Sequence, residues 1–517
     1  MKRRDFLGGA TLGTAALAAT GSASARQSAT RWGTSYGGRD MTPLPPGRPG
    51  QDYTPVMTPD GEALGFNIVD GVKVFHLVAE EVEHEFAPGL RGRCWGFNGR
   101  VHGPTIEAVE GERIRIYVTN RLPAATSIHW HGAHLPSGMD GVSGLTQRAI
   151  PPGETFRYEW TLRQHGTLMY HSHHDEMTQM ALGMMGLFII HPRHPTDDDR
   201  VDRDFALLLS EWSIRPGTAR PDPNEMVDFN VLTINAKSWP GTSPLVVRTG
   251  ERVRVRIGNL SAMNHHPFHL HGHYFRVAET DGGAIPAAAQ WPETTVLVPT
   301  GSTRTIEFIA DNPGDWAMHC HMSHHVMNQM GHHVPNMIGV DPERLDARLK
   351  PLVPGYMTMG HDGMADHGQH IAHGMPVPEN SIPMVGGDGP FGYITMGGMF
   401  TLLKVRDRID NDTDPGWYRH PPGTVAEPAS EVALSRDGIT LPENLPSARG
   451  DAHDHGHHDH GQHDHGQHDH GQHDHGQHDH GQHDHGQHDH GQHDHGQHDH
   501  AQHDHGQHDP GGGGARR

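Results

Sequence analysis

The chain has 517 residues and a formal net charge of −22 at pH 7, from 62 acidic and 40 basic residues. Half of this charge lies in residues 451–517, so the rest of the chain is only moderately acidic, which argues against nucleic-acid binding. Cys94 and Cys320 are the only cysteines, which excludes a disulfide framework as the basis of the fold.

The first 25 residues have the pattern of an export signal. Arg3 and Arg4 form a twin-arginine start, a weakly apolar run follows, and a small-residue cleavage site ends at Ala25. The apolar run is too short and too rich in Gly, Ala and Thr to span a membrane. We therefore expect residues 1–25 to be a twin-arginine signal peptide, and the mature protein to be periplasmic or secreted with no membrane span.

After an irregular arm at residues 26–65, the chain is predicted to be all-β. Short segments rich in β-branched and aromatic residues are separated by turn residues such as Asn98-Gly99, and no long segment has helical periodicity. The expected strands of the first half lie at 72–78, 113–119, 127–130, 156–162, 168–173 and 187–190. This pattern predicts a β-sandwich.

An internal repeat predicts a second sandwich. Gly-Glu-Arg-Ile-Arg-Ile at 111–116 precedes a His-Trp-His motif, and Gly-Glu-Arg-Val-Arg-Val at 250–255 precedes a His-Leu-His motif. Two copies of about 140 residues each fit the usual size of domains. We expect a first sandwich at 66–195, a second at 204–345, a Met/His-rich extension at 346–424, a linker at 425–450 and a tail at 451–517.

The tail repeats Gly-Gln-His-Asp-His with a period of five and holds 24 of the 52 histidines. It has no apolar face to bury, so we expect it to be disordered. Its neutral imidazoles are expected to bind divalent metals and to release them as the pH falls below about 6.

The motif with the most chemical content is His319-Cys320-His321, followed by His325 and Met330. Successive side chains of a strand point to opposite faces, so Cys320 faces one way while His319 and His321 face the other. A thiolate, a nearby histidine and a methionine suit a blue-copper centre, which takes two His, one Cys and a weak axial Met. The motif therefore predicts two metal sites, one on each side of a single strand.

Four His-X-His motifs occur outside the tail, at His129/His131, His171/His173, His269/His271 and His319/His321. Residues i and i+2 of a strand share a face, so each motif presents two imidazoles together. Eight imidazoles in four such pairs fit a cluster of three metals, and copper accepts imidazole well. His266 is the natural second imidazole of the blue-copper centre, which is then completed by Cys320, His325 and Met330.

At these motifs the sequence resembles the multicopper oxidases, the family of laccases and bacterial copper oxidases. The resemblance covers roughly residues 65–340 and includes His-Trp-His-Gly, His-Ser-His, His-Pro-Phe-His-Leu-His-Gly-His, and His-Cys-His followed by His and Met. It implies four copper ions in a complete active unit. The implied ligands are His129 and His269 for type 2, His131, His171, His173, His271, His319 and His321 for the type 3 pair, and His266, Cys320, His325 and Met330 for type 1.

The first copy of the repeat lacks a blue-copper site. Ser172 stands where Cys320 stands, Thr126 where His266 stands, and Met177 in place of the last histidine. The chain is therefore similar to the small two-domain bacterial laccases, which have two cupredoxin-like Greek-key sandwiches with type 1 copper in the second. That similarity implies a homotrimer, in which domain 1 of one subunit faces domain 2 of the next.

The resemblance also implies an electron path and a proton path. Electrons from a one-electron donor are expected to pass through Cys320 to His319 and His321, and four such steps reduce dioxygen to two waters. Asp140 is the expected proton relay, because the family has an acidic residue in a similar place. The alternative for Asp140 is a turn residue before Gly141.

The implied function is a laccase-like oxidase acting on small phenolic or aromatic donors. One alternative is a cuprous oxidase for copper tolerance, with Cu(I) as donor, which the Met/His segment at 357–375 favours. A copper nitrite reductase also has two cupredoxin domains, but it needs no type 3 pair. A metal-sequestering protein with an inactive core is the alternative from a different class, and the intact ligand set disfavours it.

Overall fold

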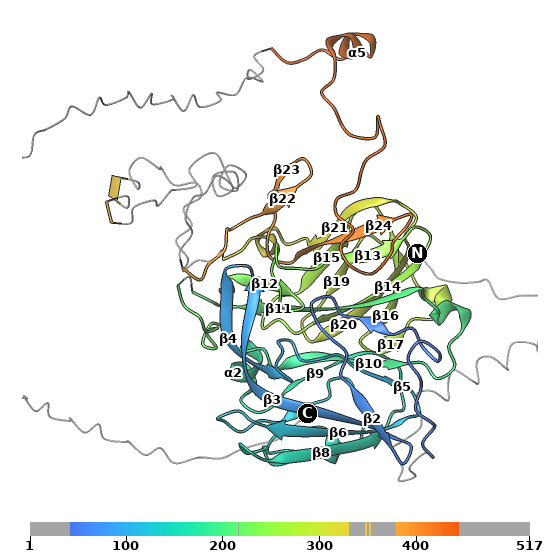
Figure 1. Ribbon diagram of the computed structural model, residues 1–517, viewed down its shortest axis with the longest axis vertical. Helices are drawn as coiled ribbons and strands as arrows, with labels where there is room; N and C mark the ends of the chain where they lie inside the picture. Colours follow the sequence, from blue (N-terminus) through green and yellow to red (C-terminus); the bar gives the residue numbers. More distant parts are fainter. Residues whose placement is uncertain (1–41, 216, 330–346, 349–350, 353–378, 444–517) are drawn as a thin grey trace, which may run out of the picture. The chain divides into compact units, whose positions relative to one another are not determined.

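The computed structural model describes residues 42–215, 217–329, 347–348, 351–352 and 379–443 (Figure 1). The expected signal peptide, the His-rich tail, Met330 and the segment at 357–375 lie outside these residues. The described residues fall into two units, which divide between Glu427 and Pro428. Everything below concerns the first unit, except helix α5 (Glu431–Arg436) in the second.

Two sheets form a first sandwich (Figure 1). One sheet has the order β2-β3-β6-β8, with β4 paired to β3, and the other has the order β5-β10-β9-β7. Their bounds are β2 (Phe66–Val69), β3 (Val72–Ala87), β4 (Leu90–Phe97), β5 (Ile106–Val109), β6 (Arg113–Asn120), β7 (Ile128–His129), β8 (Thr155–Thr161), β9 (Gly166–Ser172) and β10 (Met185–His191).

A second sandwich follows the same plan. One sheet runs β1-β11-β14-β20-β16-β17, with β12 paired to β11 and β18 to β16, and the other runs β13-β24-β21-β15-β19. The bounds are β1 (Val56–Met57), β11 (Arg203–Trp212), β12 (Val231–Ile234), β13 (Leu245–Arg248), β14 (Arg252–Asn259), β15 (His266–Leu270), β16 (Phe275–Thr280), β17 (Gly283–Ala284), β18 (Pro292–Glu293), β19 (Thr295–Val298), β20 (Ser302–Ile309), β21 (Gly314–Cys320) and β24 (Phe400–Arg406).

The remaining described elements are short. They are η1 (Ser137–Met139), α2 (Glu176–Ala181), η2 (Asp197–Asp199), η3 (Ala287–Ala289), η4 (Ser323–Val326), and the hairpin of β22 (Gly387–Gly389) and β23 (Gly392–Ile394). The predicted all-β fold is therefore confirmed. Within the described part of the chain, no helix is long and apolar enough to cross a membrane.

Strand periodicity explains how each sandwich is packed. In β6, partly buried and buried side chains alternate, and Ile114, Ile116 and Val118 are fully buried in a core that also holds Trp130. This is the two-residue period of a strand with one face on a core. The same periodicity sets the orientation of the His-X-His side chains.

Strand β24 enters the second sandwich from far along the chain. It pairs in parallel with β13, where Leu403 lies opposite Leu245, and antiparallel with β21, where Phe400 lies opposite His319. The sheet that carries the His-Cys-His motif thus includes a strand from the segment that the sequence assigned to the Met/His-rich extension.

The two sandwiches pack against each other through β9 and β10. Met169 and Leu187 share a buried apolar cluster with Leu208 of β11. Beside this cluster, Arg256 Nη1 donates a 2.9 Å hydrogen bond to Thr167 Oγ1 across the junction. The histidine motifs at the ends of β7, β9, β15 and β21 are positioned by this pair of sandwiches.

Candidate metal centres

Three donor atoms converge at the end of β21. Sγ of Cys320 lies 3.5 Å from Nδ1 of His325 and 3.6 Å from Nδ1 of His266, and the two Nδ1 atoms are 3.1 Å apart. All three residues are buried. A thiol and two imidazoles that meet at one point are the donor set of a blue-copper site, so these residues fit the expected copper.

Different elements bring these three donors together. Strand β15 begins at His266 and pairs with β21, so that Phe268 lies opposite Cys320. His325 lies in η4, directly after β21. The ring of His266 is held from behind, because its Nε2 shares a 2.7 Å hydrogen bond with Ser261 Oγ.

Burial sets the protonation of this centre. Desolvation lowers the pKa of His266 to about 3 and that of His325 to about 4, so both imidazoles are neutral at pH 7 and keep a lone pair for a metal. Desolvation raises the pKa of the Cys320 thiol to about 12. A bound metal deprotonates such a thiol, so metal uptake here is coupled to proton release.

The opposite face of β21 carries a second group of histidines. Nε2 of His319 lies 3.1 Å from Nε2 of His271, and Nδ1 of His319 donates to the carbonyl oxygen of Cys320 at 2.8 Å. Nδ1 of His269 donates to the carbonyl oxygen of Thr294 at 2.7 Å. Rings in contact within the set of His269, His271, His319 and His321 have centroids 4.7–5.7 Å apart.

The first sandwich repeats this arrangement. Nδ1 of His131 lies 3.3 Å from Nε2 of His171, and Nδ1 of His171 donates to the carbonyl oxygen of Ser172 at 2.9 Å. Rings in contact within the set of His129, His131, His171 and His173 have centroids 5.4–6.0 Å apart. Backbone carbonyls that accept from one ring nitrogen leave the other nitrogen for a metal.

The eight imidazoles form two sets of four rather than one cluster. The set on β7 and β9 and the set on β15 and β21 are each internally in contact, and the described residues show no hydrogen bond or ring contact between the sets. His131 does reach the second sandwich, but the residue it approaches there is Gly301. One chain thus presents two half-sites.

The first sandwich has no metal donors at the place that corresponds to Cys320. Ser172 Oγ and Thr126 Oγ1 both donate to Gln179 Oε1, at 2.5 and 2.7 Å, and all three side chains are fully buried. This hydrogen-bonded group fills the position. Gln179, rather than the aligned Met177, completes it.

Two carboxylates flank the histidines of the first sandwich. Asp140 Oδ1 lies 3.5 Å from Nδ1 of His129, and the Asp140 carbonyl oxygen accepts from the same nitrogen at 2.8 Å. Gly141 has φ +86°, and a Cβ there would lie 1.7 Å from the Ile128 carbonyl oxygen, so only glycine fits this turn. Glu176 Oε1 lies 3.6 Å from His171 Nδ1.

Sequence reasoning did not find the groups that orient the ligands. Ser261 and Glu211 lie against Nε2 of His266, the latter at 4.0 Å, and Thr294 anchors His269 through its backbone. None of these residues belongs to a motif, so the sequence holds no signal for them. Met330, the expected axial ligand, lies outside the described residues.

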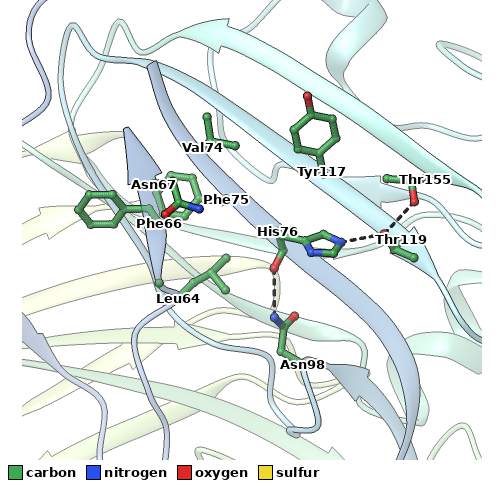
Figure 2. A pocket seen from close by; sticks show the side chains of 11 residues that line it. Leu64, Phe66, Asn67, Val74, Phe75, His76, Asn98, Tyr117, Thr119 and Thr155 are labelled. Atoms are coloured by element: carbon green, nitrogen blue, oxygen red, sulfur yellow. Dashed lines mark hydrogen bonds between the residues drawn. The ribbon is translucent and has the colours of Figure 1, made fainter. Parts of the chain in front are cut away.

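A hollow on the outer sheet of the first sandwich shares no residue with these sites (Figure 2). Four of its polar side chains have partners: His76 Nε2 bonds Thr119 Oγ1 at 2.7 Å, Thr119 bonds Thr155 at 2.8 Å, and Asn98 Nδ2 donates to the His76 carbonyl at 3.0 Å. These four side chains are thus engaged with one another or with the backbone.

Comparisons with known proteins agree with this geometry. Two family models, both described as multicopper oxidase, match residues 79–195 and 215–339. Copper resistance protein A of Pseudomonas syringae pv. tomato is 38% identical over 125 residues, which cover 24% of this chain and 20% of the relative. Copper resistance protein A of Escherichia coli is 29% identical over 351 residues, with 56% and 55% covered.

Two further relatives extend the comparison. L-ascorbate oxidase of Brassica rapa subsp. pekinensis is 32% identical over 243 residues, which cover 40% of this chain and 42% of the relative. The crystal structure of a blue copper oxidase from Nitrosomonas europaea is 26% identical, with a TM-score of 0.47, and the match covers 64% of this chain and 85% of that one. The chain spans between 20% and 55% of the length of the three curated relatives named.

The two family models, together with the donor sets at the ends of β7, β9, β15 and β21, define the class of protein. The chain belongs to the multicopper oxidase family. Membership implies copper as the cofactor.

Proposed function

We propose that the protein is a laccase-like oxidase, which couples one-electron oxidation of phenolic or aromatic donors to four-electron reduction of dioxygen to water. The observation that carries the proposal is the double-faced strand β21. Cys320 meets His266 and His325 on one face, while His319 meets His271 on the other. Copper at these sites supplies one-electron redox chemistry.

The chain connects the two faces by a short route. His319 and His321 are the covalent neighbours of Cys320, and Nδ1 of His319 also bonds the Cys320 carbonyl oxygen at 2.8 Å. Cys320 and His319 are buried, which excludes water from the link between them, whereas His321 is exposed. We assign Cys320, His319 and His321 the role of carrying electrons from the donor side to the oxygen side.

The proposed ligand sets follow the motifs and comprise four copper ions for each complete active unit. Type 2 copper falls to His129 and His269. The type 3 pair falls to His131, His171, His173, His271, His319 and His321. Type 1 copper falls to His266, Cys320, His325 and Met330.

We infer a homotrimer from the division of the histidines together with the resemblance to the two-domain bacterial laccases, which implies three subunits. Each four-histidine set holds half of the proposed cluster ligands, and the described residues bring no member of one set onto the other. A complete cluster then requires domain 1 of one copy to face domain 2 of the next. Light scattering of the copper-loaded protein should give three times the mass of the chain, and a monomeric mass with full activity would contradict the assembly.

Asp140 is the proposed proton relay on the oxygen side. Its carboxylate lies 3.5 Å from Nδ1 of His129 and stays partly open to water. It can therefore pass protons between solvent and the cluster edge. Replacing Asp140 with Asn should slow oxygen consumption but leave the rate of reduction of the type 1 site by the donor unchanged.

Cu(I) is the second candidate donor. It is favoured by Met177, Met180 and Met185, which line a cavity together with Ser261, the hydrogen-bond partner of His266. Oxygen uptake with a phenol and with Cu(I), on the full-length protein and on Cys320→Ser, tests both donors. We expect uptake with the phenol, and its loss in Cys320→Ser. Uptake with Cu(I) alone would overturn the phenolic donor. Export by the twin-arginine route and divalent-metal binding by the His-rich tail remain proposals from the sequence.

A further inference from the structure

The outer face of the sheet β2-β3-β6-β8 carries the hollow of Figure 2, which has a volume of about 760 Å³. Because side chains alternate along a strand, the outward residues of neighbouring strands form rows. His76 of β3 lies opposite Tyr117 of β6, and Tyr117 lies opposite Arg157 of β8. Two strand spacings give this row a length of about 10 Å. His76 and Tyr117 line the hollow, and Arg157 continues the row on the next strand.

The lining of the hollow combines apolar surface with hydrogen-bonding groups. Phe66 and Val74 supply apolar surface, and Figure 2 shows the ring of Tyr117 beside Val74. An amide comes from Asn67 and a hydroxyl from Thr155, and both residues are exposed. A hydroxyl has one donor and two acceptor positions, so one bond to a neighbour does not exhaust it. Such a surface suits a sugar ring, which presents C–H faces together with hydroxyl groups.

Three arginines share one carboxylate beside this hollow. Nε of Arg113 lies 2.8 Å from Oε1 of Glu159, and Nε of Arg115 lies 2.6 Å from Oε2. Nε of Arg157 is 4.0 Å from Oε2, and the Arg157 side chain is 61% exposed. Hydrogen bonds from Arg115 and Arg113 lower the pKa of Glu159 to about 2, so this carboxylate is charged at neutral pH. Three positive charges against one negative charge leave a surplus of two.

Arg157 is the arginine that is placed to meet an incoming anion. The two oxygens of Glu159 already accept hydrogen bonds from the other two arginines. An exposed ion pair at 4.0 Å contributes little to stability, so little is lost when Arg157 turns to a ligand. A guanidinium matches a carboxylate through two parallel hydrogen bonds. The position beside Tyr117 therefore favours a ligand that carries its carboxylate on a ring.

Other anionic partners fit this face less well. A nucleic acid or an anionic membrane is bound by a broad excess of basic residues. The chain instead has 62 acidic and 40 basic residues. The arginines that flank the face are already compensated, in the ion pairs Arg121–Glu80 and Arg148–Glu154. A small inorganic anion would need only a guanidinium and would make no use of the hollow.

We propose that this face binds an acidic polysaccharide, with the carboxylate of a uronate unit on Arg157 and a sugar ring packed on Tyr117 in the hollow. The binding is non-covalent and attaches the protein to an acidic polymer. The site shares no residue with the proposed metal ligands, so it goes beyond the proposed function and does not depend on it.

The test uses the full-length protein and two sugar probes. Short oligogalacturonates, which carry a carboxylate on each ring, are titrated calorimetrically at about pH 7.5, where unperturbed imidazoles are mostly neutral. Cello-oligosaccharides of the same length are the uncharged probe. The variants are Arg157→Gln and Tyr117→Ala. Their controls are Arg121→Gln, with a side chain 67% exposed, and Tyr274→Ala, at a residue 75% exposed that does not line the hollow.

We expect the wild type to bind the oligogalacturonate at least about tenfold more tightly than the uncharged probe, because the bond to Arg157 is charge-assisted. Arg157→Gln should raise the Kd of the oligogalacturonate about tenfold and leave that of the uncharged probe unchanged. Tyr117→Ala should raise both Kd values, because ring packing does not depend on charge. Both controls should bind as the wild type does, and all four variants should keep the oxygen uptake of the wild type.

Three results would overturn the proposal. The first is an equal Kd for the oligogalacturonate in Arg157→Gln and the wild type. The second is equal binding of the two sugar probes by the wild type, which would assign the hollow to neutral sugars. The third is tighter binding of phosphatidylglycerol vesicles than of oligogalacturonate, which would assign the face to a membrane. If Tyr117→Ala fails to fold, Arg157→Gln still decides, because the side chain that it changes is exposed.

Discussion

The backbone N–H of Met399 donates a hydrogen bond of 2.9 Å to the carbonyl oxygen of His325. The carbonyl oxygen of Met399 in turn accepts from the N–H of Cys320, at 3.1 Å. A single fully buried residue just before β24 therefore ties together the two segments that carry the proposed type 1 ligands. The C-terminal part of the chain thus holds the ligand loop in place.

Gly398 allows the chain to place Met399 where it makes these two hydrogen bonds. Its φ is +56°, and a Cβ there would lie 2.2 Å from the His325 carbonyl oxygen. We expect Gly398→Ala to displace the loop of His325 and to weaken the intense thiolate–copper absorption. Left-handed backbone costs a residue with a Cβ about 1–2 kcal/mol, and the clash adds to this.

The control for Gly398→Ala is Gly416→Ala. Gly416 has φ +78° with open space around its Cα, so the variant has the left-handed strain without the clash. Absorption spectra and thermal unfolding of both copper-loaded variants make the comparison. Equal absorption in the two variants would show that the Met399 segment does not position the ligands.

The position of Met399 beside β21 also shows which features of this site the sequence predicts and which it does not. The period of two in a strand is a local property, so His319, Cys320 and His321 could be assigned to two faces from their spacing alone. The pairing of Phe400 with His319 depends on a strand from a distant segment. No local pattern predicts that pairing. The second sandwich, predicted to end at residue 345, therefore leaves out β24.

The position of Ser172 in the first sandwich, which corresponds to Cys320, shows the same limit of sequence reasoning. Alignment of the repeat paired Ser172 with Cys320 and Met177 with His325. In the structure, Ser172 and Thr126 bond Gln179, whereas Met177 is 58% exposed and lines a cavity at the junction of the two sandwiches. In the first sandwich the α-helix α2 follows the motif, whereas in the second sandwich the 3-10 turn η4 holds His325, so counting positions after the motif selects the wrong side chain.

Replacement of Cys320 tests the proposed type 1 centre directly. Cys320→Ser removes the soft donor between His266 and His325, so we expect loss of the intense visible absorption, one fewer copper per chain and no oxygen uptake with a phenol. Cys94→Ala is the control, because Cys94 is equally buried but lies in an apolar cluster, and burial raises its pKa to about 12. Persistent absorption in Cys320→Ser would contradict the assignment.

Arg256 tests what holds the two sandwiches together. Its guanidinium makes a bidentate pair with Asp204 at 2.8 and 2.9 Å, lies 3.2 Å from Glu279, and donates to Thr167 of the first sandwich. Arg256→Ala leaves the buried Glu279 without its cation and leaves Asp204 with only Arg254, 3.5 Å away. Breaking such a buried pair typically costs about 3–5 kcal/mol.

Chemical denaturation measures this cost, with Arg248→Ala as the control. The Arg248 side chain is 60% exposed and pairs with Glu251 at 3.7 Å, so its loss should cost about 0–1 kcal/mol. A similar free energy of unfolding for the two variants would show that the carboxylates near Arg256 find other partners.

His102 gives a prediction for the dependence of stability on pH. It is 8% exposed, stacks on Trp212, and its Nε2 shares a 2.8 Å hydrogen bond with Ser210 Oγ. Burial lowers the pKa of His102 to about 3. In the unfolded chain its pKa returns to about 6.5, so between these two values the unfolded state binds one more proton than the folded state.

The sign of the effect follows from that difference. As the pH falls from 6.5 toward 3, protons favour the unfolded state, and His102 lowers the free energy of unfolding by about 1.4 kcal/mol per pH unit. The side chain in His102→Gln cannot titrate. As the pH falls, the free energy of unfolding of this variant should therefore decrease less steeply than that of the wild type, by about 1.4 kcal/mol per pH unit. Ser210→Ala keeps the imidazole and should lose stability at every pH while keeping the wild-type slope. Denaturant unfolding at pH 5 and pH 7 measures these free energies. Equal changes between the two pH values for wild type and His102→Gln would mean that His102 becomes protonated inside the folded protein.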